Sequence, residues 1–262
     1  MRKTIFITGA ASGIGRATAD LFSRKGWFVG MFDLDGEKLA EASRDIGENN
    51  CCYKVTDVGD IDSVHSAVAF FSEKTNYRMD ALFNCAGIMR LNSFDEIPHS
   101  EHIRTIDVNV TGVLNGIYAS LDLLKKTDNS CIISMCSASA FYGVPGLATY
   151  SASKFFVKGL TEALNIEFKK FNIRVCDLMP SYVSTPMVEK QKHYNGTLKF
   201  LGSSITPNTI ANTVYKAAHS KRMRWVPTIK LKILSSLGRI IPKSNKMFMT
   251  ILSGVNKKNI KV

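Results

Sequence analysis

The sequence has 262 residues, 45% of them hydrophobic, which is enough for one large globular domain with a sizeable core. Its apolar runs are too short for a secretory signal or a membrane-spanning helix, which argues against secreted and integral membrane proteins. No two of the six cysteines have Cys-x-x-Cys spacing, so we expect free, buried thiols in the reducing cytoplasm.

The charge of the chain is distributed unevenly. Its net charge is +12, yet residues 190–262 hold 15 Lys and Arg and no acidic residue, which leaves −3 on residues 1–189. Such asymmetry predicts that an acidic surface, ligand or partner meets the C-terminal part.

The chain begins with the pattern of a nucleotide-binding βαβ unit. A strand at Lys3–Ile7 leads into the glycine-rich turn Thr8–Gly15 and then into a helix. The first glycine permits a tight turn, the second a close approach to a pyrophosphate, and the third close helix packing. The helix N-terminus attracts phosphate. We therefore assign Gly9, Ser12, Gly13, Ile14 and Gly15 to a nucleotide site; a flexible glycine turn is the alternative.

A second strand, Trp27–Phe32, ends in Asp33. A carboxylate at this place accepts hydrogen bonds from an adenosine ribose and repels a 2′-phosphate. Ser12 and Leu34 supply no cation for such a phosphate, which favours NAD over NADP. The alternative is that Asp33 is an ordinary residue at a strand end.

Two further strands are expected at Cys51–Val55 and Asp80–Phe83, and helices at Asp35–Ile46 and Ile61–Lys74. The turn after the third strand places Asp57 and Val58 for contact with adenine, and the fourth strand exits through Asn84–Gly87. A long helix, about 100–125, contains Asn109 and Gly112, which are poor helix formers and predict a local distortion. A surface-facing asparagine is the alternative.

A fifth strand, Cys131–Met135, ends near Ser137, and the next helix runs to about Phe171. That helix carries Tyr150 and Lys154, one turn apart on one face. We expect the lysine ammonium to lower the phenol pKa from about 10, making the tyrosine an acid and base nearer neutral pH. The alternative is a half-buried aromatic beside a solvated lysine.

A sixth strand at Asn172–Met179 is followed by Pro180, an irregular stretch at 186–206 that predicts a substrate loop, and a helix from Thr206 to about Ser220. A short last strand is expected at Trp225–Pro227. Alternating strands and helices predict one α/β domain, residues 1–262, with a three-layer, Rossmann-type, doubly wound parallel sheet. The turns assigned above meet where the strands end, which suggests hydride transfer between nicotinamide and a carbonyl or alcohol.

Together these motifs resemble the short-chain dehydrogenase/reductase family in its single-domain form, over roughly residues 3–187. The motifs that carry the resemblance are Thr8–Gly15, Asn84–Gly87, Asn109, Ser137, Tyr150 with Lys154, and Pro180–Thr185. The sequence departs from the family pattern at three places: Ser181 replaces glycine, Cys85 replaces asparagine, and Met135-Cys136 stands where small residues are usual.

The resemblance implies a role for each matching residue. Tyr150 would exchange a proton with the substrate oxygen, Ser137 would orient that oxygen, Lys154 would tune Tyr150 and hold the nicotinamide ribose, and Asn109 would position a relay water. Asp57 and Val58 would contact adenine, Asn84 the central region of the cofactor, and Val183 and Thr185 the nicotinamide amide. The remaining expected cofactor contacts are Leu34, Ala86, Gly87 and Pro180. The five histidines form no ligand set, so no metal is expected.

The basic segment at about 228–262 interleaves lysines with large apolar residues, as in Lys230–Ile241. This pattern fits a helix lying on an anionic membrane. The same pattern fits a helix that covers an apolar substrate cleft or forms a subunit interface. The basic charge of residues 190–262 also fits a surface that binds an acidic carrier. Nucleic-acid binding is not expected, because no recognition motif accompanies the charge.

The sequence thus predicts a cytoplasmic, NAD(H)-dependent oxidoreductase that interconverts a secondary alcohol and a ketone on an apolar, lipid-like substrate, with peripheral membrane contact as an option. A 3-oxoacyl-thioester reductase acting on acyl-carrier protein or coenzyme A is one alternative. A non-catalytic NAD-binding sensor or scaffold is another. The resemblance implies a homo-oligomer, a dimer or tetramer.

Overall fold

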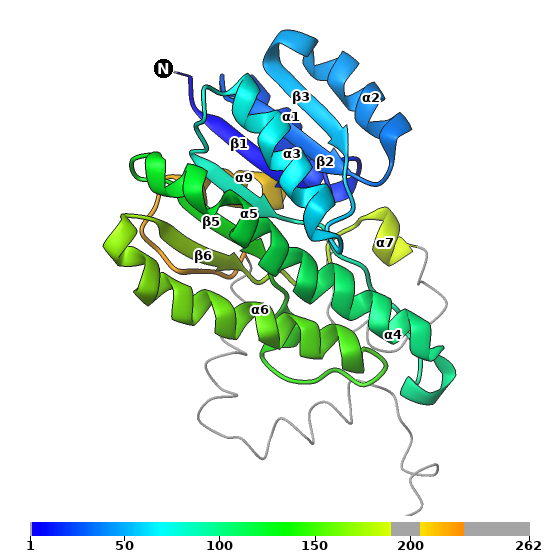
Figure 1. Ribbon diagram of the computed structural model, residues 1–262. Helices are drawn as coiled ribbons and strands as arrows, with labels where there is room; N and C mark the ends of the chain where they lie inside the picture. Colours follow the sequence, from blue (N-terminus) through cyan, green and yellow to red (C-terminus); the bar gives the residue numbers. More distant parts are fainter. Residues whose placement is uncertain (1, 190–204, 228–262) are drawn as a thin grey trace, which may run out of the picture.

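The computed structural model describes residues 2–189 and 205–227 (Figure 1). Its centre is a seven-stranded sheet with the order β3-β2-β1-β4-β5-β6-β7, in which every pairing is parallel. The strands are β1 (Thr4–Thr8), β2 (Phe28–Asp33), β3 (Cys51–Val55), β4 (Ala81–Asn84), β5 (Cys131–Met135), β6 (Arg174–Leu178) and β7 (Arg224–Trp225).

The continuous apolar strands are buried on both faces. In β1, Ile5 and Ile7 contribute to one hydrophobic core and Phe6 to the other, because successive side chains of a strand point to opposite faces. All three are fully buried. Such runs are typical of parallel sheets that helices cover on both sides.

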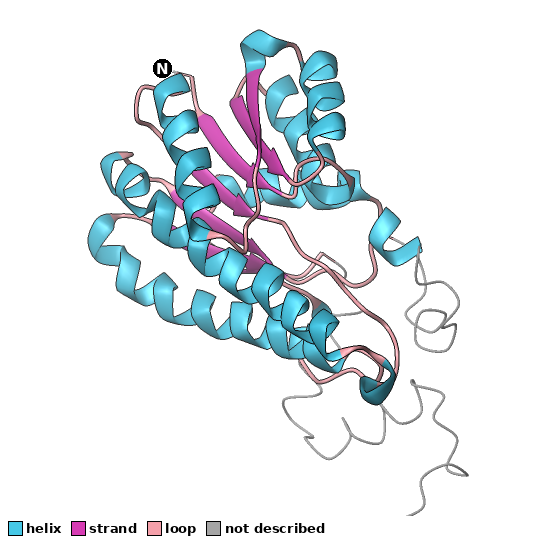
Figure 2. Cartoon of the chain, turned by 45° about the vertical axis from the view of Figure 1, so that its right-hand side comes forward, coloured by secondary structure: helices cyan, strands magenta, loops and turns pink. Residues whose placement is uncertain are grey.

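Two helical layers cover the sheet (Figure 2). The core on one face is built with α1 (Gly13–Arg24), α2 (Gly36–Ile46) and α9 (Pro207–Ala218). The core on the other face is built with α3 (Ile61–Lys74), α5 (Gly112–Lys126) and α6 (Ala148–Glu167). The predicted three-layer, doubly wound α/β fold is therefore confirmed.

The strand order reverses between β1 and β4, and ligands of such sheets bind in the crevice that opens at this point. Thr8 at the end of β1 ties the two strands together there. Its hydroxyl oxygen accepts hydrogen bonds from the backbone N–H groups of Cys85 at 3.1 Å and Ala86 at 3.2 Å.

The predicted distortion of the long helix is confirmed. The helix consists of α4 (His99–Ile106), a π-helical segment (Asp107–Thr111) and α5. Asn109 lies in the π-helical segment and is fully buried. Gly112 follows because a Cβ there would lie 2.7 Å from Cγ2 of Val58.

Several predicted boundaries shift. The sixth strand begins at Arg174 rather than Asn172, because a short 3-10 helix (Phe168–Phe171) ends in Asn172 with a left-handed φ of 58°. The last strand begins one residue early, at Arg224. The segment predicted as irregular begins with the short helix α7 (Pro186–Glu189). Most of that loop and the basic segment 228–262 lie outside the described residues. No described helix has the length and apolarity needed to cross a membrane.

Candidate active site

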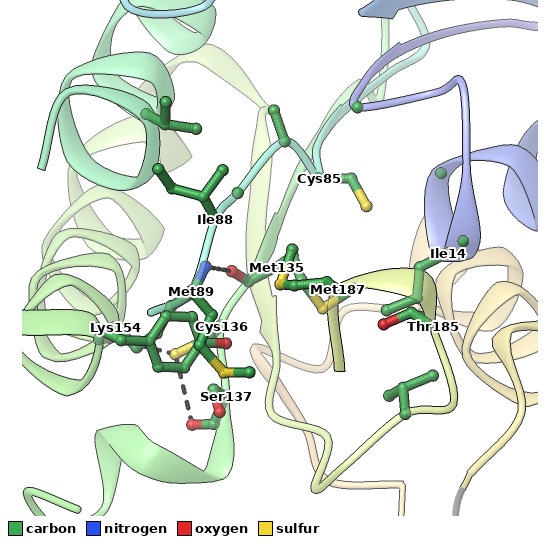
Figure 3. A pocket seen from close by; sticks show the side chains of 18 of the residues that line it. Ile14, Cys85, Ile88, Met89, Met135, Cys136, Ser137, Lys154, Thr185 and Met187 are labelled. Atoms are coloured by element: carbon green, nitrogen blue, oxygen red, sulfur yellow. Dashed lines mark hydrogen bonds between the residues drawn. The ribbon is translucent and has the colours of Figure 1, made fainter. Parts of the chain in front are cut away.

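A cavity of about 620 Å³ lies beside the turns that follow the strands. Most of the predicted site residues line it: Gly9, Ser12, Gly13, Ile14, Gly15, Asp33, Leu34, Asp57, Val58, Ala86, Gly87, Ser137, Tyr150, Lys154, Pro180, Val183 and Thr185. The two predicted residues that do not line the cavity are Asn84 and Asn109. Figure 3 shows Lys154 and Ser137 on one side, with Ile14 and Thr185 on the opposite side.

At one end of the cavity, the glycine-rich turn brings backbones together too closely for side chains. Gly9 has a φ of +69°, and a Cβ there would lie 2.8 Å from backbone atoms of Ala86. A Cβ on Gly15 would overlap the carbonyl of Gly9. Ser12 is the N-cap residue of α1, and its side chain makes no capping hydrogen bond. The backbone N–H groups of the first helical turn are therefore not occupied by this side chain. This cradle fits the diphosphate of a dinucleotide.

Asp33 fixes the glycine-rich turn as well as lining the cavity. Its Oδ2 accepts a hydrogen bond from the Ala11 N–H at 3.0 Å, and its Oδ1 from the Asp35 N–H at 3.2 Å. Each carboxylate oxygen keeps further acceptor capacity. The other acidic lining residues are Asp57, Asp60 and Asp107, and Arg104 is a cation among the lining residues.

At the other end, Ser137, Tyr150 and Lys154 stand together. The Tyr150 hydroxyl is hydrogen-bonded to the Ser137 side chain. The Lys154 ammonium is buried and donates to the Met135 carbonyl at 2.9 Å. Its Nζ lies over the Tyr150 ring, 5.6 Å from the ring centroid. The predicted pairing of Tyr150 with Lys154 on one helix is thus present, on α6.

The predicted pKa of Tyr150 is wrong in direction. Burial raises the pKa of this phenol above its usual value, and the hydrogen bond with Ser137 offsets only part of the rise. Burial also lowers the pKa of Lys154. The Lys154 ammonium donates to the Met135 carbonyl, and burial sets the direction of the Tyr150 shift.

Asn109 organises the site from behind. Its Oδ1 accepts from the Ile88 N–H at 2.8 Å, and its Nδ2 donates to the Ile88 carbonyl at 2.9 Å and to the Ser153 hydroxyl at 3.1 Å. Ser153 in turn donates to the Tyr150 carbonyl at 2.6 Å. The amide therefore joins the loop after β4 to the helix that carries Tyr150, and the relay role of Asn109 stays a prediction.

Asn84 is buried at the end of β4, where its side-chain oxygen and nitrogen have no hydrogen-bond partner in the described structure. A Cβ on Gly116 of α5 would overlap its Oδ1, so this glycine makes room for the amide. The contact of Asn84 with a cofactor stays a prediction.

Sequence reasoning missed the residues that shape the Tyr150 end. Two loops, after β4 and after β5, form a small apolar cluster with Tyr150, and the residues of this cluster belong to no motif that could have identified them. The cluster consists of Met89, Leu91, Val144 and Leu147, with Tyr142 packed against it. Tyr182 and Met187 also line the cavity.

Two cysteines also line the cavity, Cys85 and Cys136. Withdrawal from water raises the pKa of each thiol to about 12, so both are protonated near neutral pH. All six cysteines are free thiols, and five are buried.

Comparison with known proteins gives the family. The model of the short chain dehydrogenase family matches residues 3–195. The chain is 36% identical over 190 residues to the oxidoreductase UcpA of Salmonella typhimurium, covering 71% of this chain and 72% of the relative. It is 31% identical over 192 residues to a cyclopentanol dehydrogenase of Comamonas sp., covering 72% and 76%. The chain belongs to the short-chain dehydrogenase family.

Solved structures of short-chain dehydrogenases share its fold. A member from Burkholderia phymatum, in complex with NAD, matches with a TM-score of 0.83 at 21% identity, covering 93% of this chain and 95% of that one. The 3-ketoacyl-(acyl-carrier-protein) reductase of Brucella melitensis, complexed with NADH, matches with a TM-score of 0.76 at 26% identity, covering 86% and 96%.

As a short-chain dehydrogenase, the protein is an oxidoreductase acting on CH–OH groups, and this chemistry needs a hydride carrier such as nicotinamide. The residues present fit such a group, because the glycine cradle and the Asp33 carboxylate share one cavity with Tyr150. Among residues 2–189 and 205–227, no three His, Cys, Asp or Glu side chains gather as metal ligands.

Proposed function

We propose that this protein interconverts a secondary alcohol and a ketone on an apolar, neutral substrate with NAD(H). The observation that carries the proposal is the placement of Ser137, Tyr150 and Lys154 on the wall of the same cavity as the glycine cradle and Asp33. Hydroxyl, phenol and ammonium are the groups needed to orient a carbonyl oxygen and to exchange its proton.

The nicotinamide ring, when bound, supplies or accepts the hydride. The residues of the chain handle the oxygen of the substrate. In reduction, Ser137 and Tyr150 hold the carbonyl oxygen by hydrogen bonds, and Tyr150 donates its proton to that oxygen. In oxidation, the ionised phenol takes the proton of the alcohol. Lys154 holds the nicotinamide ribose, and Asn109 keeps α6 in place through Ser153.

Three features support NAD over NADP. The Asp33 carboxylate lines the cavity and is held by two backbone N–H groups, so it cannot easily move away from a 2′-phosphate. Ser12 and Leu34, the neighbours that line the cavity beside it, carry no positive charge. The other acidic residues that line the cavity would add to the repulsion of a phosphate.

The lining around Tyr150 supports an apolar, neutral substrate. Met89, Val144, Leu147 and Met187 are apolar, and Lys154 is the cation among the lining residues at this end. A charged substrate would lose its hydration on entering this end of the cavity, and no unpaired side chain of opposite charge among the described residues lines it to offset that cost.

Reduction of a 3-oxoacyl thioester is the second candidate. The likeness to a 3-ketoacyl-(acyl-carrier-protein) reductase favours it, and so does the basic composition of residues 190–262, which suits an acidic carrier. A non-catalytic NAD-binding protein is not favoured, because such a protein would not need the intact Ser137, Tyr150 and Lys154 set. Assembly into a dimer or tetramer in the cytoplasm is part of the proposal, by analogy with the family.

The deciding test is Tyr150→Phe, with Tyr118→Phe as the matched control, since Tyr118 is exposed on α5. A panel of secondary alcohols, ketones and 3-oxoacyl thioesters is followed by NADH absorbance. We expect the Tyr150 variant to lose ~10²–10⁴ in turnover. NADH should still bind both variants more tightly than NADPH, as measured by fluorescence. Full turnover by the Tyr150 variant would rule out this tyrosine as the acid, and tighter NADPH binding would rule out the cofactor assignment.

A further inference from the structure

Three hydroxyl groups that the mechanism does not use line the Tyr150 end of the cavity. They belong to Ser139, Tyr142 and Tyr182. The hydroxyl oxygen of Ser139 is buried and has no hydrogen-bond partner in the described part of the chain. The residue as a whole is 6% exposed. Tyr142 and Tyr182 are half-buried.

The two loops that carry these hydroxyls are joined to each other. Ser139 lies in a short 3-10 helix (Ala138–Ala140), whose Ala138 N–H donates to the Pro180 carbonyl at 2.9 Å. Tyr182 follows Pro180 closely, and its carbonyl accepts from the Ile205 N–H at 3.2 Å. The backbones of the hydroxyl-bearing loops are therefore fixed before any ligand arrives.

The buried Ser139 hydroxyl is costly to leave without a hydrogen bond, and a ligand oxygen would satisfy it. The three hydroxyls suit a neutral oxygen, because the loops that carry them contribute no charged lining side chain. Burial raises the pKa of the Tyr142 phenol. Burial and the neighbouring Tyr142 together raise the pKa of the Tyr182 phenol to about 12. Both phenols therefore remain protonated at neutral pH and can donate a hydrogen bond.

We propose that Ser139, Tyr142 and Tyr182 form a subsite for a second oxygen of the substrate. The substrate is then a neutral diol, hydroxyketone or diketone, with one oxygen at Tyr150 and the other at these hydroxyls. This inference rests on the proposed function, since it takes the alcohol or ketone at Tyr150 as given. Ser137 is distinct from the subsite: its oxygen accepts from the Ser139 N–H at 3.2 Å and pairs with Tyr150.

The test compares cyclohexanol with the cyclohexane-1,2-, 1,3- and 1,4-diols, which hold the second oxygen at fixed positions. The readout is the ratio of kcat/KM for each diol to that for cyclohexanol. Dissociation constants of the same compounds on the NADH complex give a second readout. Ser139→Ala, Tyr142→Phe and Tyr182→Phe each remove one hydroxyl and keep nearly the same shape. Tyr118→Phe is the control.

We expect at least one diol to exceed cyclohexanol by about tenfold or more, which is the effect of one well-placed hydrogen bond. The Tyr182 variant should lose most of that ratio, with a matching loss in binding, while the Tyr118 variant keeps it. Turnover of all four compounds with a ratio near one, or a ratio that all three subsite variants leave intact, would overturn the subsite and leave the proposed function standing. If the protein binds NADH but turns over no alcohol or ketone, the proposed function fails, and the subsite fails with it.

Discussion

At the scale of single residues, a few buried polar contacts set the chemistry of the site. The Tyr150 hydroxyl is hydrogen-bonded to Ser137, and the Tyr150 carbonyl accepts a hydrogen bond from the Ser153 hydroxyl. The Ser153 hydroxyl in turn accepts one from the side-chain amide of Asn109. Gly87 lacks a side chain because a Cβ there would lie 3.2 Å from the Asn109 Oδ1 and 3.7 Å from the Lys154 Nζ. The acid–base group is therefore positioned by residues on three separate segments.

The raised pKa of Tyr150 predicts different pH profiles for the two reaction directions. Because the phenol is protonated throughout the neutral range, the acid needed for ketone reduction is already present, and that rate should stay flat from about pH 6 to 9. The phenolate needed for alcohol oxidation is scarce at neutral pH. It increases about tenfold per pH unit below the pKa, so the oxidation rate should rise steadily toward pH 10. Initial rates in both directions, over a series of buffers, measure this difference. An oxidation rate that levels off near pH 7 would contradict it.

The two cysteines that depart from the family pattern are also described at this scale. Cys85 and Cys136 line the cavity as protonated thiols, and the Cys136 thiol donates to the Lys154 carbonyl at 3.3 Å. A sequence-based argument could note these cysteines but could not tell a reactive thiol from an inert one. Burial decides that question, and burial is a property of the folded chain.

At the scale of elements, α6 carries the site and is linked to the sheet by an ion-pair network in which Asp177 is buried and Glu162 is partly exposed. Arg224 of β7 donates from Nη2 to the Asp177 carboxylate at 2.8 Å and pairs with Glu162 of α6 at 3.0 Å. Asp177 is fully buried in β6, and burial raises its pKa even though Arg224 opposes the rise.

Arg224→Met should therefore lower the free energy of unfolding by about 3–5 kcal/mol at neutral pH, because it leaves a buried carboxylate without its cation. The double variant Asp177→Leu with Arg224→Met should recover most of this loss. The control is Arg16→Met. Arg16 pairs with Asp20 and with the well-exposed Asp45, so this variant should lower the free energy of unfolding by less than about 1 kcal/mol. Urea unfolding at pH 7 measures each value.

The same comparison at lower pH tests the cause. A raised pKa means that the protonated carboxyl is the form favoured by folding, so the deficit of Arg224→Met should shrink as pH falls and Asp177 takes up a proton. A deficit that does not change with pH would mean that lost packing, not the unpaired charge, causes it.

Most elements could be predicted because each has a local signal. The third strand and the helices at Ile61–Lys74 and Gly36–Ile46 lie within two residues of their predicted bounds, since apolar periodicity and the caps Asp35 and Asp60 define them. The sequence predicts that the sixth strand begins at Asn172, two residues before its start at Arg174. Asn172 instead has a left-handed backbone conformation, which has only a weak sequence signal.

At the scale of the whole molecule, the excess positive charge is concentrated in residues 190–262, much of which lies outside the described residues. If that charge with its interleaved apolar residues meets a lipid surface, the full chain should sediment with vesicles of anionic lipid at low salt. Binding should weaken as salt screens the charges, and a chain truncated after residue 227 should lose it. Equal sedimentation of both chains would place the lipid contact elsewhere, and no binding at low salt would exclude a lipid surface.

The sequence by itself determined the fold class, the glycine cradle, the Asp33 carboxylate and the Tyr150 and Lys154 pair. Each of these depends on residues close together in the chain, where apolar periodicity, glycine spacing and helical spacing act locally. The family resemblance added roles for residues in separate motifs.

Only the tertiary structure decided which residues surround Tyr150 and what protonation it favours. Met89, Tyr142 and Tyr182 come from three loops that meet because β4, β5 and β6 are neighbours in the sheet. The pKa of Tyr150 rises because those loops and α6 withdraw it partly from water. Desolvation depends on everything packed around a group, so no spacing of residues along the chain could have revealed it.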